Sequence, residues 1–461
     1  MSETGGHPSE SEEQRRRMLE TPVPPLVCRL AVPTICSMLV TSAYNTADTY
    51  FVSQIGASAS GAVGIVFSIM AIIQAVGFTI GVGAASIASR LLGQGRQQEA
   101  DTYASSAVAS AVTSGVLLSL LGFFRLDGLI WLLGSTETIY PFARQYAFFI
   151  LLGAPLMILS FVLNNLLRWQ GRANLAVIGL TTGGVLNIFL DPLFIFKFRL
   201  GIAGAGAATL LSQSVSTAIL ISFFVTGKSD LRVSLHSVSR SPRIYFAILK
   251  QGLPSLFRQG IMSVSTMAIN FNARVYGDAA VAAIAIVNKV FMLIHSITIG
   301  FGHGFQPVLG YNYGAGRNDR VMEAVSFSLK ICTSILAAAA LLCFLFAPQI
   351  ITVFRRSDPD VITIGARAMR FQCFTLPLSA VLTFSNMLFQ ALGKFWRAIL
   401  LAVCRQGLCI PLVFLFSRLW GLTGLELTQA CADLISGLLA ALIMGLFFRR
   451  EFGKESGPGT E

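Results

Sequence analysis

The sequence has few charged residues. Asp, Glu, Lys and Arg make up only 12% of its 461 residues, about half of the roughly 25% that is usual in soluble proteins. Hydrophobic residues make up 54%, and the mean hydropathy is +0.70. A soluble protein of this size could not hide so much apolar surface from water. The composition predicts an integral membrane protein, and it excludes a disordered chain, a secreted disulfide scaffold and a nucleic-acid-binding protein.

Sequence signatures of enzymes and of ATP-driven pumps are also missing. There is no G-x-x-x-x-G-K-[ST] phosphate loop, no G-x-S-x-G and no H-E-x-x-H in the chain. The eight cysteines include no C-x-x-C pair, and the four histidines are scattered, so buried cysteines are expected to act as small hydrophobic residues. We therefore expect neither a catalytic site nor an organic cofactor.

Twelve apolar stretches lie between residues 26 and 447, each close to the roughly 20 residues that a helix needs to cross a bilayer. The longest polar interruption falls halfway along the chain. The predicted organisation is a polar tail at 1–25, a six-helix lobe at 26–225, a linker at 226–249, a second six-helix lobe at 250–448 and a polar tail at 449–461.

Lys and Arg are distributed unevenly between the two sides of this predicted bundle. With the amino terminus placed in the cytoplasm, 20 of the 34 Lys and Arg residues fall in cytoplasmic segments and 7 in outer loops. Cytoplasmic loops of membrane proteins carry an excess of these residues. The asymmetry predicts a multi-pass protein of the cell (plasma or inner) membrane with both termini in the cytoplasm.

The two halves of the chain repeat each other. An offset of 221 residues, without any gap, superposes one proline pair and five glycine pairs: Pro33 and Pro254, Gly56 and Gly277, Gly81 and Gly302, Gly83 and Gly304, Gly93 and Gly314, and Gly95 and Gly316. Because each half has six spans, both enter the membrane from the same side. The predicted fold is an all-α bundle of twelve transmembrane helices in two six-helix lobes, related by a pseudo-two-fold axis along the membrane normal, as in many secondary transporters.

Polar residues inside the apolar stretches of the first half are the candidates for function, because ionisable groups are costly in hydrocarbon. Ser37, Thr41, Tyr44, Asn45 and Asp48 form one polar stripe at helical spacing in the first span. In the fifth span, small residues recur every four positions and lead to two polar ones: Gly179, Gly183, Asn187 and Asp191, followed by Pro192. Thr209 lies early in the sixth span, before Ser212 and Gln213.

Depth along the helices indicates that four of these side chains meet. At 1.5 Å per residue, Asp48 lies about 6 Å, Thr209 about 9 Å, Asp191 about 10 Å and Asn187 about 16 Å from the outer ends of their spans. Two carboxylates, an amide oxygen and a hydroxyl suit Na⁺ or exchangeable protons. The four residues are therefore predicted to form a cation site, with Na⁺ as the candidate metal ion. The alternative is that Asp48 and Asp191 only cap helix ends.

The second half has its own charged residues within spans, and they carry more positive than negative charge: Arg258, Lys289, Arg367, Arg370, Arg405, Glu426 and Asp433. Asp433 lies about 15 Å from the outer end of its span and Arg405 about 12 Å from the inner end of its neighbour. These depths nearly coincide in a core about 30 Å thick. We expect a buried ion pair with a structural role rather than a coupling role.

Four separated segments resemble the multidrug and toxic compound extrusion (MATE) transporters. They are LAVPTICSMLVTSAYNTADTYFVSQIG in the first span, LNIFLDPLFIF at 186–196, GIAGAGAAT at 201–209 and GFQPVLGYNYGAGRNDR at 304–320. The resemblance runs from about residue 26 to residue 448. It is strongest to the bacterial branch whose coupling carboxylates lie in the amino-terminal lobe.

This resemblance implies two lobes around a central cavity and cation-driven export of amphipathic, often cationic aromatic compounds by alternating access. It also carries the amino-lobe cation site over onto Asp48, Asn187, Asp191 and Thr209. Where other branches have an acid in the seventh helix, this chain has Arg258 and Gln259, and the tenth span has no acid. Candidates for the substrate cavity rest on helix position alone, with simple packing as the alternative: Tyr44, Asn45, Gln74, Met157, Phe161, Asn270, Asn288 and Gln372.

Several alternatives stay open at this point. Within transport, the alternative is a flippase or exporter of a lipid-linked or other endogenous amphipathic metabolite, which the cationic second half favours. An integral membrane enzyme would need clustered His, Asp or Glu at one membrane face, and a channel fits poorly with an internal repeat. The identity of the substrate and the choice between Na⁺ and H⁺ do not follow from the residues. The expected partners are the bilayer and small amphipathic substrates, with no nucleic acid, and the expected functional unit is a monomer.

Overall fold

The computed structural model describes residues 10–354 and 358–451, and these residues fold into helices joined by short turns. In chain order the helices are α1 (Glu10–Glu20), α2 (Val23–Ser53), α3 (Ala57–Gly93), α4 (Gln97–Phe124), α5 (Leu126–Leu132), α6 (Tyr140–Trp169), α7 (Ala173–Pro192), the π-helix η1 (Leu193–Lys197), α8 (Gly201–Val225), the 3₁₀ helix η2 (Leu235–Ser237), α9 (Pro242–Arg274), α10 (Asp278–Gly314), α11 (Asn318–Leu345), α12 (Ala347–Phe354), α13 (Pro359–Ala391) and α14 (Phe395–Glu451). No strand occurs among the described residues.

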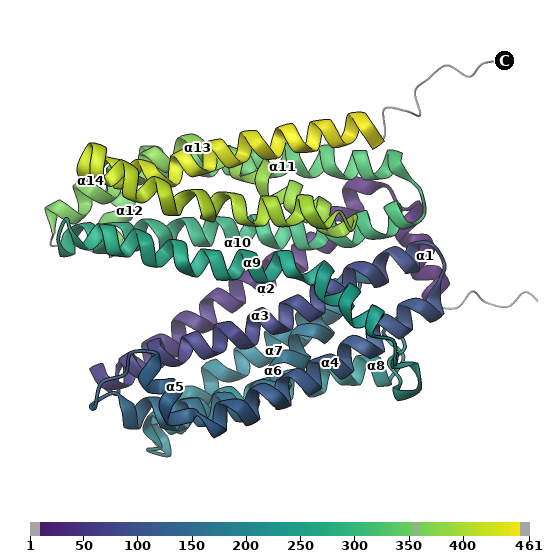
Figure 1. Ribbon diagram of the computed structural model, residues 1–461, viewed down its shortest axis with the longest axis horizontal. Helices are drawn as coiled ribbons and strands as arrows, with labels where there is room; N and C mark the ends of the chain where they lie inside the picture. Colours follow the sequence, from purple (N-terminus) through teal and green to yellow (C-terminus); the bar gives the residue numbers. More distant parts are fainter. Residues whose placement is uncertain (1–9, 355–357, 452–461) are drawn as a thin grey trace, which may run out of the picture.

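Ten of the described helices are long and apolar enough to cross a membrane. α14 consists of two helices, because Gly421 (φ 59°, ψ −136°) breaks the helical geometry and the chain reverses direction there (Figure 1). α9 has 33 residues and packs along α3 and α14, although it is less apolar than the others. Counting α9 and both halves of α14, the described chain has twelve long helices, as predicted.

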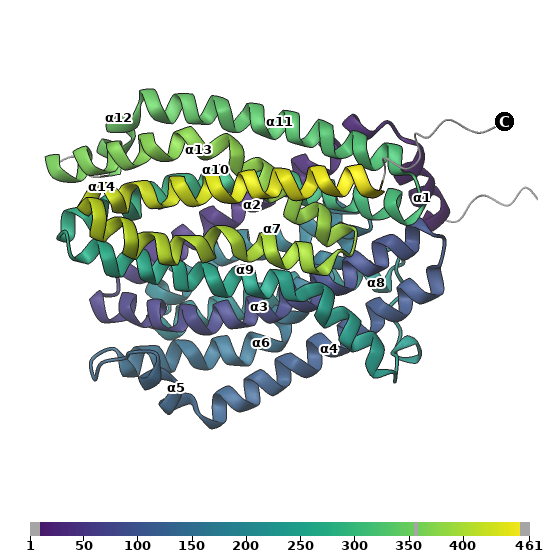
Figure 2. The same ribbon diagram turned by 45° about the horizontal axis from the view of Figure 1, so that its top comes forward.

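The long helices form two lobes (Figures 1 and 2). The amino-terminal lobe contains α2, α3, α4, α6, α7 and α8, and the carboxy-terminal lobe contains α9, α10, α11, α13 and α14. The lobes contact each other mainly through α2 with α10, α3 with α9 and α3 with α10. They meet near the end of the molecule at which α1 and the last turn of α14 lie, called the terminal side below, and diverge toward the opposite side (Figure 1).

Contacts between the lobes follow the predicted repeat. A Cβ atom on Gly93 of α3 would lie 2.2 Å from the Tyr311 carbonyl oxygen, and one on Gly314 of α10 would lie 2.2 Å from the Arg90 carbonyl oxygen. Residues 93 and 314 differ by 221, and so do residues 90 and 311. Each lobe therefore presents the same backbone surface to the other, which confirms the pseudo-two-fold relation between the halves.

A second pair of contacts repeats in the same way, closer to the middle of the helices. A Cβ atom on Gly83 would lie 2.1 Å from the Ile248 carbonyl oxygen and 3.1 Å from the Gly252 nitrogen, and one on Gly304 would lie 2.4 Å from the Ala31 nitrogen. Any side chain larger than hydrogen at these positions would push the helices apart. The repeated glycines thus allow helices of the two lobes to pack backbone against backbone.

Helix ends differ from the predicted boundaries in three places. α2 already begins at Val23, and α9 begins at Pro242, so the latter helix covers the last eight residues of the predicted 226–249 linker. α14 continues to Glu451, three residues past the predicted end of the second lobe. Prolines at the starts of α2 and α9 and charged residues at the end of α14 extend these helices beyond the apolar stretches, and hydropathy alone does not predict such extensions. Residues 1–9 and 452–461 of the predicted tails lie outside the described residues.

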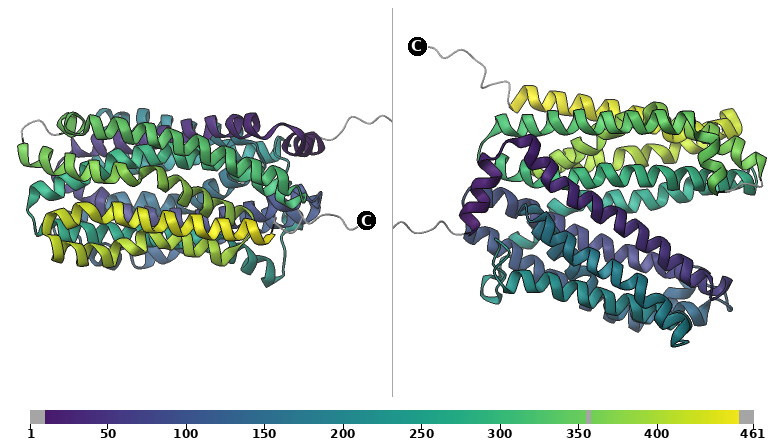
Figure 3. Two further views of the ribbon diagram at one scale, coloured as in Figure 1. Left: turned by 90° about the horizontal axis from the view of Figure 1, so that it is seen from above. Right: turned by 180° about the vertical axis from the view of Figure 1, so that it is seen from behind.

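α1 lies across the terminal side and contacts both lobes (Figure 3). On the amino-terminal lobe, Arg15 donates to the Gly93 carbonyl oxygen (3.0 Å) and Gln14 to that of Gln170 (3.2 Å). On the carboxy-terminal lobe, Arg317 donates to the Leu19 carbonyl oxygen (2.7 Å). The predicted polar tail is therefore in part an ordered helix that bridges the lobes.

Candidate cation site

The centre of the site is the end of α7, where Asn187 and Asp191 lie one helical turn apart. The Asn187 Nδ2 atom donates to Asp191 Oδ1 (3.0 Å), and the Asp191 side chain is fully buried. Pro192 removes a backbone donor, and the chain continues as the π-helix η1. Such short π segments occur frequently at functional sites. The local sequence therefore holds a carboxylate inside the lobe and changes the helix geometry directly after it.

A second carboxylate reaches the site from α2. Asp48 interacts directly with Asp191, and Tyr44 lies one turn before it on the same helix. Asp48 Oδ1 and Asp191 Oδ2 are both buried and have no hydrogen-bond partner among the described residues. Two facing carboxylates have only acceptor atoms when both are ionised, so neither can satisfy the other. A proton or a small cation between them would satisfy both.

A small cavity adjoins these carboxylates. Its volume is about 20 Å³, which is enough for one water-sized occupant. It is lined by residues of α2, α3, α6, α7 and α8: Tyr44, Asp48, Met70, Tyr146, Gly183, Gly184, Asn187, Thr209, Ser212 and Gln213. The Ser212 hydroxyl is also buried without a partner. The donor set is made of oxygen atoms, which suits Na⁺ or a proton.

The structure brings the four predicted cation-site residues together. Asp48, Asn187 and Thr209 line the cavity, and Asp191 contacts two of its members. Asn45 lies in α2, but its side chain is outside the described part of the structure. In the described residues, no group of three or more His, Cys, Asp or Glu side chains could hold a metal ion, so the site has only two carboxylates to offer a cation.

Tyr146 of α6 is a site residue that sequence reasoning missed. It lines the cavity, its hydroxyl interacts with Thr209, and it lies within electrostatic range of Asp48 and Asp191. The signal that could have found it is depth, because Tyr146 lies six residues after Tyr140, the first residue of its helix. That is about 9 Å along the helix, the same depth as the other members of the site.

The predicted cavity residues lie at the contact of the lobes, inside the amino-terminal lobe and in the carboxy-terminal lobe. Gln74 of α3 accepts a hydrogen bond from Gln259 of α9 (3.3 Å), which joins the two lobes. Met157 is buried, and Phe161 packs on Phe78 with ring centroids 5.2 Å apart, both inside the amino-terminal lobe. Each of these two therefore has a packing role in this state.

The remaining cavity candidates lie in the carboxy-terminal lobe. Asn270 is exposed on α9. Gln372 donates to Gln429 Oε1 (2.6 Å), and Gln429 donates to Asn288 Oδ1 (2.9 Å). Gln429, which sequence reasoning did not select, thus connects two predicted residues from α13 and α10 into one polar chain.

Both acidic side chains predicted within spans of the carboxy-terminal lobe are paired with arginines. Arg405 and Asp433 form the predicted buried ion pair between the two halves of α14, and Arg367 makes two hydrogen bonds to Glu426 (2.5 and 2.8 Å). Removing one partner of such a buried pair leaves an uncompensated charge and is strongly destabilising. A structural role accounts for both pairs.

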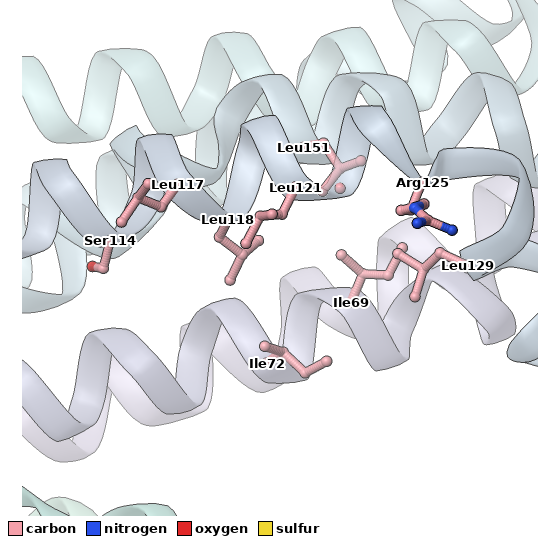
Figure 4. A pocket seen from close by; sticks show the side chains of 10 residues that line it. Ile69, Ile72, Ser114, Leu117, Leu118, Leu121, Arg125, Leu129 and Leu151 are labelled. Carbon is pink, nitrogen blue, oxygen red and sulfur yellow. The ribbon is translucent and has the colours of Figure 1, made fainter.

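A larger groove of about 430 Å³ lies away from the predicted site (Figure 4). Ile69 and Ile72 of α3 face Leu117 and Leu121 of α4 across it, and Arg125 stands at one end. None of the predicted cation-site or cavity residues lines this groove. Its apolar walls are typical of a surface that lipid covers, and they offer no ligand set for a cation.

Comparison with known proteins agrees with the geometry. The sequence profile of the MatE family matches residues 33–193 and again residues 254–415, and the two matches begin 221 residues apart, as the repeat requires. The multidrug export protein MepA of Staphylococcus saprophyticus is 27% identical over 418 residues, which cover 90% of this chain and 92% of that protein.

Two solved structures share the whole arrangement of helices. A crystal structure of MATE in the bent conformation has a TM-score of 0.90 at 26% identity and covers 98% of this chain and 100% of that chain. The outward-facing conformation of a multidrug resistance MATE family transporter of the MOP superfamily has a TM-score of 0.89 at 26% identity, over 96% and 98% of the two chains. With both halves matched by the same profile and the complete fold shared, the chain belongs to the MatE family of transporters.

Proposed function

We propose that this protein is a cation-coupled antiporter that exports amphipathic, often cationic aromatic compounds by alternating access. The observation that carries the proposal is the pair of buried carboxylate oxygens, on Asp48 and Asp191, without partners beside a cavity for one occupant. Membership of the MatE family and similarity to MepA, which is named a multidrug export protein, support export as the direction of transport. The chain is a transporter and not an enzyme.

Asp191 is the central coupling carboxylate in this proposal, and Asp48 assists it. Two ionised carboxylates about 4 Å apart repel each other by about 4 kcal/mol at an effective dielectric constant of about 20. A proton or Na⁺ between them removes this repulsion and satisfies both orphan oxygens. Asn187 orients Asp191 by donating to Oδ1, while the hydroxyls of Thr209 and Tyr146 complete the lining.

Binding of the cation biases the helices that supply its ligands. α2, α7 and α8 contact one another, so drawing Asp48 and Asp191 together changes the packing of α2 on α7. The π-helix after Pro192 is the place at which α7 can bend, because its hydrogen-bond pattern is already shifted. A cation shifts the equilibrium between two states only through different affinities for them. The proposal therefore requires a site that is intact in one state and distorted in the other.

We further propose that the protein lies in the plasma or inner membrane. Its orientation is the one that the Lys and Arg asymmetry predicts, with both termini in the cytoplasm. The terminal side is then cytoplasmic, and the lobes diverge toward the outside, as in an outward-facing state. The functional unit is one chain, with the lobes at 26–225 and 250–448 as its moving parts. Substrate meets the amide side chains of Gln74 and Gln259, together with the Gln372, Gln429 and Asn288 chain.

The alternative function is transport of a lipid-linked or other endogenous amphipathic metabolite that carries an anionic group. It is favoured by two arginines near the contact of the lobes, Arg168 and Arg258, which lie within electrostatic range of each other and of His303. Arg168 Nε and His303 Nδ1 are buried and have no hydrogen-bond partner among the described residues. Such a cluster suits a phosphate or carboxylate group.

Dye efflux from vesicles tests the proposal. Purified protein is reconstituted, and movement of a cationic fluorescent dye is followed under separately imposed Na⁺ and H⁺ gradients. We expect efflux that depends on at least one gradient and is lost in Asp191→Asn. Asp127→Asn is the matched control, because the Asp127 side chain is exposed and pairs with Arg144 at the surface, away from the cation site. Gradient-driven efflux that persists in Asp191→Asn would contradict the proposed site, and movement of anionic but not cationic dyes would favour the alternative.

A further inference from the structure

The ion pair in α14, between Arg405 and Asp433, has the geometry in which a carboxylate binds a guanidinium cation. Arg405 donates through Nε to Asp433 Oδ1 and through Nη2 to Asp433 Oδ2 (3.2 Å). Asp433 is only 1% exposed, and no other Lys or Arg forms an ion pair with it in the part of the chain that the structure describes. Paired N–H donors on both oxygens are the arrangement in which a guanidinium binds a carboxylate most strongly. Arg405 thus neutralises Asp433 from within the lobe.

Two independent structural correspondences between the lobes show which amino-terminal residues are equivalent to this ion pair. Asn164 of α6 donates to the Ala176 carbonyl oxygen, and Asn386 of α13 donates to that of Ala398, which gives an offset of 222 for α7 and the first half of α14. Gly201 and Gly421 have φ values of 58° and 59°, which gives an offset of 220 for α8 and the second half of α14.

Both offsets are supported by a reciprocal exchange of side-chain size. Gly179 of α7 packs against Leu220 of α8. Their counterparts at these offsets are Leu401 and Ala440, which are both buried. A small residue of α7 and a large one of α8 therefore correspond to a large residue in the first half of α14 and a small one in its second half.

At these offsets, Arg405 corresponds to Gly183 and Asp433 to Gln213. Gly183 and Gln213 both line the cation cavity of the amino-terminal lobe. The ion pair therefore occupies the two-fold counterpart of that cavity, at positions where the amino-terminal lobe has a glycine and an amide.

Neighbours of the guanidinium follow the same correspondence. Arg405 interacts with Cys409, and the Cys409 thiol lies beside Ser265 of α9. Offsets of 222 and 221 relate these two residues to Asn187 and Tyr44, which also line the amino-terminal cavity.

The two coupling carboxylates themselves have no acidic counterpart. Asp191 corresponds to Val413 and Asp48 to Ile269, and both of these residues are buried and apolar. The carboxy-terminal pocket thus keeps one acid, Asp433, on a different wall, and one cation that is part of the chain.

We propose that Arg405 is a built-in cation in the carboxy-terminal counterpart of the cation cavity, and that Asp433 is the carboxylate of a latent site for a guanidinium ion. This inference rests on the proposed cation site of the amino-terminal lobe. Because the guanidinium cannot leave, the carboxy-terminal pocket is neutral at every stage of transport. One cycle then uses the amino-terminal site alone, and the carboxy-terminal lobe does not respond to the coupling gradient.

Chemical rescue tests the latent site. Arg405→Gly introduces the residue found at the counterpart position, removes the cation and leaves a space beside Asp433. We expect low millimolar guanidinium chloride to raise the thermal unfolding midpoint of purified Arg405→Gly by a few degrees, and to leave that of the unsubstituted protein unchanged. The matched control is Arg405→Gly with Asp433→Gln, which recreates the pair Gly183 and Gln213 and has no carboxylate to bind the ion. Equal shifts in the single and double variants, or no shift in either, would overturn the proposal.

The double variant keeps the test decisive if Arg405→Gly does not accumulate. It contains no unpaired buried charge, so we expect it to fold and to retain gradient-driven efflux. Failure of the single variant to accumulate beside a well-folded double variant supports the pairing, because only the former has an uncompensated carboxylate. A double variant that folds but loses coupling overturns the inference. The effect of Asp191→Asn is measured separately, so failure of the amino-terminal site is distinguishable from failure of the latent one.

Discussion

Substituting a glycine at the contact of the lobes should shift the conformational equilibrium of the protein by a predictable amount. A Cβ atom on Gly93 would lie 2.2 Å from the Tyr311 carbonyl oxygen, whereas ordinary contact begins at 3.4 Å. Gly93→Ala therefore requires α3 and α10 to separate by about 1 Å, and overpacking of this kind costs about 1–3 kcal/mol. The cost falls only on the state in which the lobes meet at the terminal side. The population should shift toward the opposite state by a factor of about 5 to 150.

Thiol labelling measures this shift. Ser89 is 1% exposed and lies against Gly310 of the other lobe, so Ser89→Cys reports separation of the lobes in a background without the eight native cysteines. We expect Gly93→Ala to increase the rate at which a water-soluble reagent labels this position. Gly260→Ala is the matched control, because no atom lies within 4 Å of a Cβ at this helical glycine, and the substitution should only stabilise α9 by about 0.5–1 kcal/mol. Equal labelling rates in the two variants would refute the argument.

The two-fold counterpart sharpens the prediction. Gly314→Ala should act like Gly93→Ala, since its Cβ would lie 2.2 Å from the Arg90 carbonyl oxygen. Both contacts belong to the same crossing of α3 and α10, and a separation that relieves one also relieves the other. The double variant should therefore shift the population by less than the product of the two single effects. Strict additivity would show that the two contacts are independent.

Three further substitutions test other parts of the molecule. Tyr146→Phe should weaken cation binding about 2- to 10-fold, because the hydroxyl that interacts with Thr209 is worth about 0.5–1.5 kcal/mol; cation-dependent thermal stabilisation measures this, and an unchanged cation affinity would contradict it. Arg15→Gln should lower the free energy of unfolding by about 1.5–3 kcal/mol through its bonds to Gly93, while Arg16→Gln, which loses only an exposed pair, should change it much less; equal losses in denaturant titrations would argue against a bridging role for α1. Gln429→Ala should raise the apparent KM for substrate in the efflux assay and leave the unfolding midpoint nearly unchanged, and an unchanged KM would exclude Gln429 from the cavity.

Depth and periodicity are the properties of a membrane protein that its sequence encodes most directly. Residue spacing gives the height of each polar side chain along its helix, and heights alone brought Asp48, Asn187, Asp191 and Thr209 to one level. The structure indeed collects these residues around one cavity. Matching heights also predicted the ion pair of Arg405 and Asp433 between the two halves of α14, which the structure confirms.

The height of a residue along its helix does not determine which side chains of other helices it contacts. Rotation of a helix about its axis decides whether Phe161 packs inside a lobe or faces the other lobe, and this rotation depends on packing against several helices at once. The reversal at Gly421 needs a positive φ value, which a glycine permits but does not require. The position of α1 depends on hydrogen bonds to backbone carbonyl oxygens at helix ends. Every residue has such an oxygen whatever its side chain, so the sequence does not predict where α1 binds.

The bridge formed by α1 has a consequence for how the protein is made. α1 leaves the ribosome before either lobe, but part of its binding surface, which includes Arg317 and Arg320, lies about 300 residues later in the chain. At about 5–20 residues per second, roughly 15 to 60 s pass before that surface is synthesised. During this time Met18, which is completely buried in the finished protein, has no complete pocket to occupy. α1 therefore reaches its final position only after the second lobe has begun to form, because the start of α11 supplies part of its binding surface.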